Sequence, residues 1–301
     1  MSGGVFEANG KAFELALPGF DNSLRVNVTS QGSSKAKNRL TITHGRFLTA
    51  EDALAAGKPL KQALLLAGLL FDIGIDVGNE AVLSGPAHRA DGKVDESLQP
   101  DVHGLLVYPE GSSQVWFGFF GEYIVETPIT PASFQSKIAE CFFPNHSIGD
   151  KVMLAAQLFS QSFFLTSAKA RFITLISAVE VLAEPEESSA RIVELVSGFL
   201  TTAEAAAGVD ADEQQSLVDR LKYLKRESIG AACRRLVTKN LGSDKAKLFR
   251  NLYDTRSMLV HTGYSPPPDL LSDQLRELQG LVRKLLVNEI KAGLAPPAPA
   301  R

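Results

Sequence analysis

The sequence predicts two domains, an N-terminal α+β domain at residues 1–148 and an all-helical bundle at 149–293. The first half contains short runs in which apolar and polar residues alternate, as they do in half-buried strands. The second half repeats apolar residues at helical spacing, and Gly and Pro residues separate its segments. A chain of 301 residues is long enough for each domain to bury a hydrophobic core.

Composition narrows the class of protein. The net charge of the chain is -3. The only two cysteines, Cys141 and Cys233, lie far apart in the sequence, so neither a disulfide framework nor a zinc-binding pattern is predicted. The N-terminus has no signal-peptide pattern, and the longest apolar run, Leu60 to Phe71, is shorter than the roughly 20 residues of a membrane span. We therefore expect a cytoplasmic protein with no membrane segment, and we predict no metal or cofactor.

Three alternating runs near the N-terminus predict strands at Phe13–Leu17, Leu24–Val28 and Leu40–Thr43. The polar stretch Gln31–Asn38 predicts a hairpin loop between the second and the third. A small antiparallel sheet is therefore expected at the start of the chain.

Helix signals follow this sheet. Thr49 resembles an N-cap, with Asp52 three residues later in a weak capping box. Gly57 is expected to end this short helix and Pro59 to open a second one, which buries the apolar run.

The rest of the first half alternates between loops and strands. Ile73–Leu83 predicts a strand interrupted by two glycines, and Ser84–Pro100 predicts a long polar loop. Leu105–Tyr108 and Val115–Phe120 predict a hairpin, and Thr130-Pro131 opens a helix that ends near residue 141. The sequence from Pro144 to Gly149 then predicts the domain boundary.

The second half is predicted to be helical throughout. Its expected helices are 150–165, 167–182, 188–200, 213–224, 228–238, a helix capped by Asp244 that ends at 261, and a last helix from 269 to 292. Four phenylalanines at helical spacing, Phe159, Phe163, Phe164 and Phe172, are expected in the core. Residues 294–301 are rich in Pro and Ala, and we expect a disordered tail there.

One motif on the penultimate predicted helix suggests chemistry. The stretch Leu252-Tyr-Asp-Thr-Arg256-Ser-Met-Leu-Val-His261-Thr-Gly resembles the HEPN superfamily, and most closely its ApeA-like branch. An upstream segment, Ile173-Thr-Leu-Ile-Ser-Ala-Val-Glu180-Val-Leu, is similar to the Glu-bearing long helix of these domains. The resemblance covers roughly residues 150 to 292. It implies a metal-independent endoribonuclease that leaves 2′,3′-cyclic phosphate ends, with roles in defence against phage or as a regulated toxin.

Cleavage of RNA without a metal needs groups that move protons and a fixed cation. Histidine suits the proton transfers because its usual pKa is near neutrality, and arginine suits the phosphate because its planar fork stays charged. Arg256 and His261 supply one of each. Five residues separate them, which is about 140° around a helix, so both can meet one phosphate only at a frayed helix end or across two protomers. The resemblance likewise implies a homodimer through the helical domain.

Two further polar residues share a stripe with His261. Ser257 lies four residues before it and Asp254 lies three before Ser257, so both are expected in supporting roles, as is Glu180. Their order is superficially that of a serine hydrolase triad, but side chains of one helix rise in line and do not converge. We therefore reject that interpretation.

The segment that delivers the motif is basic. Between Arg220 and Arg256 there are eleven Lys and Arg residues against three Asp and Glu residues. Such a surface attracts phosphate, so RNA is the predicted partner, with Arg234, Arg235, Lys239 and Arg250 as candidate contacts. A solvated helix surface is the ordinary alternative.

Two classes of function remain open. The competing hypothesis is a non-catalytic HEPN module that dimerises and binds RNA or a protein, in which Arg256 only pairs with Glu180 and His261 only ends its helix. Active members often carry Asn, Asp or His after the arginine, and Ser257 does not decide between the two. The N-terminal half has no chemical motif, and a sensor or specificity role for it is an analogy.

Overall fold

The computed structural model describes residues 4–6, 12–17, 24–30, 38–43, 47–78, 82–83, 102–103, 105, 127–143 and 148–294. Across these residues the chain is mostly helical, and every strand of three or more residues lies before residue 130. Several predictions fall outside the described ranges: the loops at 31–37 and 84–100, the hairpin beyond Leu105, the start of the boundary at 144–147 and the tail after residue 294.

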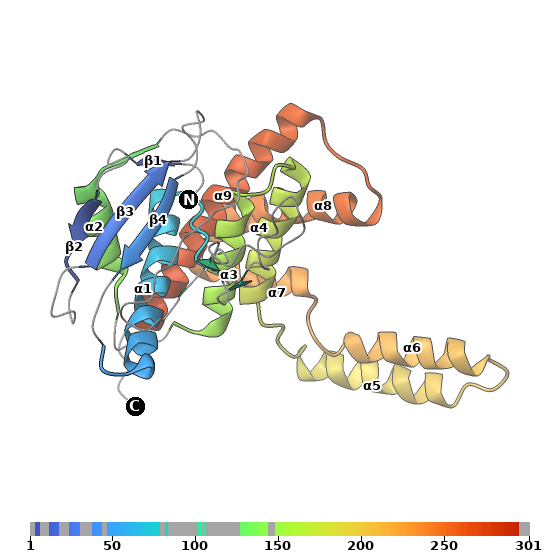
Figure 1. The fold of residues 1–301 in the computed structure, drawn as a ribbon. Helices are drawn as coiled ribbons and strands as arrows, with labels where there is room; N and C mark the ends of the chain where they lie inside the picture. Colours follow the sequence, from blue (N-terminus) through green and yellow to red (C-terminus); the bar gives the residue numbers. More distant parts are fainter. Residues whose placement is uncertain are drawn as a thin grey trace, which may run out of the picture.

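The predicted N-terminal strands are confirmed. β2 (Ala12–Leu15), β3 (Leu24–Ser30) and β4 (Asn38–Thr43) form an antiparallel sheet in that order, which lies beside α1 and α2 (Figure 1). β1 (Gly4–Phe6) pairs in parallel with β7 (Thr127–Ile129), and β5 (Val82–Leu83) pairs with β6 (Val102–His103). Leu15 and Leu24 are completely or almost completely buried under the sheet.

The first helix is one continuous element, α1 (Ala50–Phe71). The predicted cap is confirmed, because the Asp52 amide donates to Thr49 Oγ1 over 3.1 Å. The predicted break is wrong, since the helix runs through both Gly57 and Pro59. A Cβ at Gly57 would overlap the side chain of Leu105, so this glycine makes room for a neighbouring side chain and does not end the helix.

The helix cap also provides a prediction of stability. Replacing Thr49 with Ala removes the acceptor for the Asp52 amide, and we expect the free energy of unfolding to fall by about 1 kcal/mol. Thr202→Ala is the control, because the Thr202 hydroxyl only bonds to the Gly198 carbonyl within a helix. Urea unfolding followed by circular dichroism would measure both. An equal loss in the two variants would contradict a capping role.

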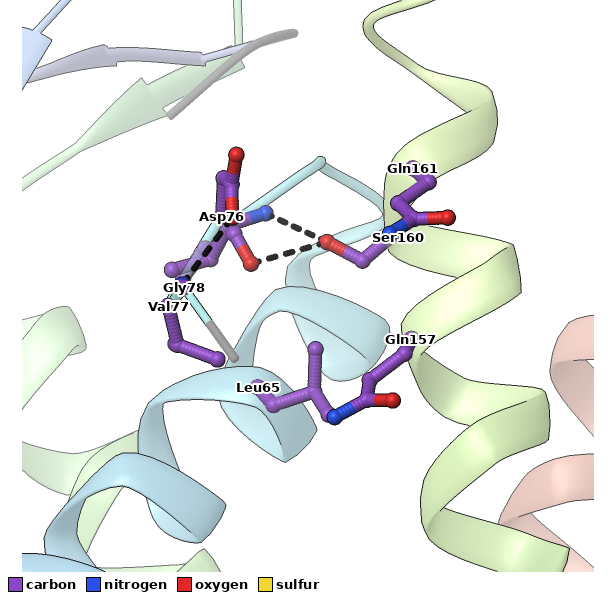
Figure 2. A pocket seen from close by; sticks show the side chains of 8 residues that line it. Leu65, Asp76, Val77, Gly78, Gln157, Ser160 and Gln161 are labelled. Atoms are coloured by element: carbon purple, nitrogen blue, oxygen red, sulfur yellow. Dashed lines mark hydrogen bonds between the residues drawn. The ribbon is translucent and has the colours of Figure 1, made fainter. Parts of the chain in front are cut away.

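The chain that follows α1 is not the predicted strand up to residue 78. Asp72 has φ 60° and its amide donates to carbonyls of the last turn, which ends α1. Ser160 then holds Ile75 at both backbone groups, accepting from its amide and donating to its carbonyl, each over 2.9 Å (Figure 2). Ile73 and Ile75 are buried where this segment lies against α3, and only a single β-bridge at Gly74 marks it as strand-like.

α1 passes the length and hydropathy criteria for a membrane span, with a mean hydropathy of 1.3 over its best window, and no other helix among the described residues does. Its apolar side chains pack against α2 (Pro131–Cys141) and α3 (Asp150–Ser162), which is the pattern of a core helix. α2 begins where predicted, at a capping box between Thr130 and Ser133.

The C-terminal bundle consists of α3, α4 (Ala168–Leu182), α7 (Ile229–Leu241), α8 (Ser243–His261) and α9 (Pro268–Leu294). These helices pack around one apolar cluster, and α4 and α9 run through its centre (Figure 1). Phe159, Phe163 and Phe172 are buried as predicted. Phe164 is the exception at 38% exposure, because α3 ends at Ser162 instead of the predicted 165.

Two helices stand apart from this bundle. α5 (Ala190–Glu204) and α6 (Ala211–Tyr223) form an antiparallel hairpin that extends away from the other helices (Figure 1). Its base is closed by backbone hydrogen bonds from Ser188 N–H to Lys225 and from Glu227 N–H to Glu186.

The last helix is bonded to the end of the first. Arg283 on α9 donates to the carbonyls of Leu69 and Leu70 in the last turn of α1, at 2.9 and 2.5 Å, and the Leu69 carbonyl also accepts from the Asp72 amide. Gln279 donates to the carboxylate of Asp72, the residue that caps α1. The C-terminal bundle therefore holds the helix that supports the N-terminal sheet.

Candidate active site

α8 carries the predicted motif and has well-defined ends. It starts after Gly242, whose φ of 88° lies in the left-handed region, so this glycine allows α7 to pass directly into α8. The predicted cap, Asp244, lies inside the first turn instead. At the other end, the Thr262 amide and hydroxyl both donate to the Met258 carbonyl, and α8 remains helical as far as His261.

Arg256 is held from the neighbouring helix α4. Its Nη2 lies 3.2 Å from Glu180 Oε1, and the two side chains are only 22% and 18% exposed. Tyr253 Oη donates to the same carboxylate over 2.9 Å, and the Arg256 guanidinium lies 5.7 Å from the centre of the Tyr253 ring. The site is therefore a three-residue cluster in which Glu180 fixes a cation and a phenol.

The third residue of this cluster, Tyr253, was not predicted. It lies three residues before Arg256, so both project from the same side of α8, and this spacing was the available signal. Gly230 on α7 leaves room for the ring, because a Cβ there would lie 3.0 Å from Tyr253 Cε1. Burial and the hydrogen bond to Glu180 raise the pKa of Tyr253 to about 12.

His261 lies apart from this cluster. It is exposed at the last residue of α8, and no hydrogen bond joins it to Arg256 among the described residues. Asp254 is exposed and Ser257 half-buried, and in the described part of the chain neither bonds to His261. α8 is a regular helix up to His261. The side chains of His261 and Arg256 in one chain therefore point about 140° apart around the helix axis.

The four predicted RNA contacts have different environments. Arg235 pairs with both Glu186 and Glu227 at 2.6 Å, next to the base of the α5–α6 hairpin. These bonds lower the pKa of Glu227 and engage most of the Arg235 guanidinium. Lys239 and Arg250 are exposed and Arg234 is half-buried, and none of these three forms an ion pair within the described residues.

No alternative site competes with α8 in the described ranges. No group of three or more His, Cys, Asp or Glu side chains there could hold a metal ion. A small hollow beside Ser160 is lined by residues including Leu65, Asp76 and Gln157 (Figure 2). The Ser160 hydroxyl there already bonds twice to the Ile75 backbone, so its role is structural.

Cys233 packs beside the cluster and provides a test of its burial. The thiol is fully buried, and burial, with the charge of Glu180, raises its pKa to about 12. Burial raises the pKa of the other thiol, Cys141, to about 12 as well. We expect both thiols to resist an aromatic disulfide reagent at about pH 8 and to react fully in denaturant, since the thiolate is the reactive form. Rapid reaction in the native protein would contradict this packing.

Comparison with known proteins adds no relative: no protein-family model, curated protein or solved structure matches the chain.

Proposed function

We propose that the protein is a metal-independent endoribonuclease of HEPN type, in which Arg256 binds the scissile phosphate and His261 transfers protons. The observation that carries the proposal concerns the last two turns of α8, where a firmly held arginine precedes an exposed histidine. A cation fixed in place stabilises developing negative charge without reorganising during the reaction. An exposed imidazole can reach a substrate in solution.

The proposed reaction proceeds in one displacement. A histidine takes the proton of a ribose 2′-hydroxyl, and the 2′-oxygen attacks phosphorus. The bond to the 5′-oxygen breaks, and that oxygen receives a proton from an acid, leaving a 2′,3′-cyclic phosphate and a 5′-hydroxyl. Arg256 supports the extra negative charge on the phosphoryl oxygens.

A second copy of the chain completes the proposed cleft. The divergence of Arg256 and His261 along a regular helix favours this arrangement over a site built within one chain. In a symmetric homodimer, two clefts form, and in each the arginine of one copy and the histidine of the other face the same phosphate.

The proposed fold assignment is two domains. Residues 149–293 form the HEPN-type helical domain, and residues 1–148 form an α+β domain that acts as a sensor or specificity element. The two apolar clusters, one centred on α1 and one on α4 and α9, support this division, and they meet where Leu69 of α1 joins the second cluster and Ala156 of α3 joins the first.

One observation favours the alternative function, a non-catalytic module that binds RNA or a protein. Glu180 neutralises Arg256, so a phosphate must compete with a carboxylate for the guanidinium. In this alternative, exposed Lys239 and Arg250 contact the RNA backbone and no bond is broken.

The experiment that tests the proposal is cleavage of end-labelled RNA in EDTA, with analysis of the product ends. The wild type should give 2′,3′-cyclic phosphates, and Arg256→Ala and His261→Ala should not. Lys247→Ala is the matched control, because Lys247 is an exposed cation near the other end of α8. Equal cleavage by all four proteins would overturn the catalytic roles, and RNA binding without cleavage by any of them would support the module.

A further inference from the structure

Among the residues that the structure describes, part of the apolar surface of the α5–α6 hairpin has no partner. Its own small core consists of Val196, Leu200, Ala203, Val218 and Leu221, and the two helices pack chiefly on each other. A second set of apolar side chains is about half exposed: Ile192 (43%), Leu195 (54%) and Phe199 (51%) on α5, Leu217 (49%) on α6 and Leu224 (56%) at the C-cap of α6. We call this second set the hairpin face.

The five residues of the hairpin face lie on one side of the hairpin. On each helix the exposed residues lie about 75° around the helix axis from the buried residues. The direction of this rotation is the same for both helices when each is viewed from its N-terminus to its C-terminus. Because the two helices are antiparallel, equal rotations bring both exposed stripes to the same side. The result is one continuous apolar surface two helices wide.

The charges around this face exclude some partners. Residues 188–227 contain five Lys and Arg residues and seven Asp and Glu residues, a net charge of -2, which disfavours an anionic membrane or nucleic acid. The charges of α6 are also separated along the helix. Asp210, Asp212 and Glu213 begin it, whereas at or just beyond its end Arg220, Lys222, Lys225 and Arg226 outnumber Asp219, which pairs with Lys222, and Glu227, which pairs with Arg235.

We infer that the hairpin face binds a second copy of itself, with each α6 antiparallel to the other. A helix that is acidic at its start and basic at its end is complementary to its own antiparallel copy. Glu213 and Arg220 lie two turns apart on the outer edge of the face, so each opposes the other type of charge across a two-fold axis near Leu217. The result is a four-helix bundle made from two hairpins.

The same axis fits the other helix of the hairpin. The Gln214 side chain bonds to the Ala203 carbonyl and the Ser188 amide bonds to the Lys225 carbonyl, which sets Leu217 near the level of Phe199. Gly198 is adjacent to Phe199, and a Cβ there would meet nothing within 4 Å of its own chain. No contact within its own chain requires a glycine at this position inside the helix, and the missing side chain leaves space for the Phe199 ring of the second copy.

The size of the face sets the expected affinity. Two helices of about four turns present a surface roughly 20 Å by 20 Å, which is at the low end of specific interfaces. We therefore expect a dimer with a dissociation constant on the order of micromolar. This inference does not depend on ribonuclease activity, because it concerns only the hairpin.

Sedimentation velocity of the full chain over a concentration series from about 1 to 100 micromolar tests the inference. The wild type should show a concentration-dependent association step through the hairpin, separate from a dimer formed through α8, and Leu195→Glu combined with Phe199→Glu should weaken this step at least tenfold. Leu270→Glu is the matched control, since Leu270 is 50% exposed but lies on α9, away from the hairpin. Circular dichroism should be unchanged in both variants, because each replaced side chain is exposed.

Charge reversal tests the antiparallel arrangement. Glu213→Arg alone and Arg220→Glu alone each place like charges opposite each other, so both should weaken the dimer. An equimolar mixture of the two variants should associate again, because both contacts between unlike copies then join opposite charges. Failure of the mixture to recover would overturn the antiparallel pairing.

Other outcomes would overturn the inference as a whole. A wild type without a concentration-dependent association step over the whole range would do so, as would a series of association steps that the Leu195→Glu, Phe199→Glu variant leaves entirely unchanged. A monomer that sediments with anionic vesicles, and loses this binding in the same variant, would instead assign the face to a membrane. RNA cleavage is measured separately, so its absence does not affect these results.

Discussion

Replacing His261 with Ala is expected to lower RNA cleavage in EDTA by about 10²–10⁴-fold, the usual contribution of a positioned acid or base. The side chain is exposed at the end of α8, so the free energy of unfolding should change by no more than about 0.5 kcal/mol. Single-turnover cleavage and urea unfolding of the same preparation separate the two effects. A variant that retains full activity would eliminate His261 as the proton-transfer group.

Mixing two inactive variants tests whether the cleft is shared between copies. Arg256→Ala and His261→Ala should each be inactive alone. In a mixed dimer, one cleft combines the intact arginine of one copy with the intact histidine of the other, so random pairing should restore about a quarter of wild-type activity. No recovery, despite demonstrated exchange of subunits, would contradict a composite cleft.

Replacing Glu180 with Ala is expected to lower the free energy of unfolding by about 2–3 kcal/mol. The change leaves the Arg256 guanidinium half-buried without its carboxylate and removes the acceptor of the Tyr253 hydroxyl. Glu194→Ala is the matched control, because Glu194 is an exposed carboxylate within α5. Urea unfolding would measure both, and a loss below about 0.5 kcal/mol in Glu180→Ala would show that the cluster contributes little.

The ionisation of Tyr253 provides a second readout of this cluster. The pKa of Tyr253 is raised to about 12, so the protonated phenol is favoured in the folded protein. Its contribution to stability is complete below the ordinary tyrosine pKa of about 10 and is lost as the pH rises through about 12. Tyrosinate absorbance, compared with that of Tyr253→Phe, should show this ionisation at lower pH in Glu180→Ala.

The helices of the second half could be predicted from sequence because their caps and periodicities are local. Ser167 and Ser228 cap α4 and α7 through their side chains. Each serine stands directly before an apolar run, and this local pattern indicates the start of a helix. Predictions from local signals failed where a distant contact decides the structure. Gly57 accommodates Leu105, and Ile75 is held by Ser160, which lies 85 residues away.

The site shows the same division between local and distant information. Arg256 and His261 were identified from one continuous motif, and the pairing of Arg256 with Glu180 was expected both as a structural contact and as support for Arg256. The bonds of Arg235 to Glu186 and Glu227 could not be foreseen, because they depend on how the hairpin base meets α7. Its role as an RNA contact stays a prediction.

The bonds from Arg283 to Leu69 and Leu70 have a consequence for synthesis on the ribosome. They join residues 214 and 213 positions apart, so the Leu69 and Leu70 carbonyls lack the Arg283 guanidinium until almost the whole chain has been translated, and only the local Asp72 cap closes α1 before then. A nascent chain that stops before α9 also lacks Leu278, Leu281 and Leu285, which are completely or almost completely buried in the finished bundle. Prematurely terminated chains should therefore remain open to proteases, and α8 acquires its final packing only when translation is nearly complete.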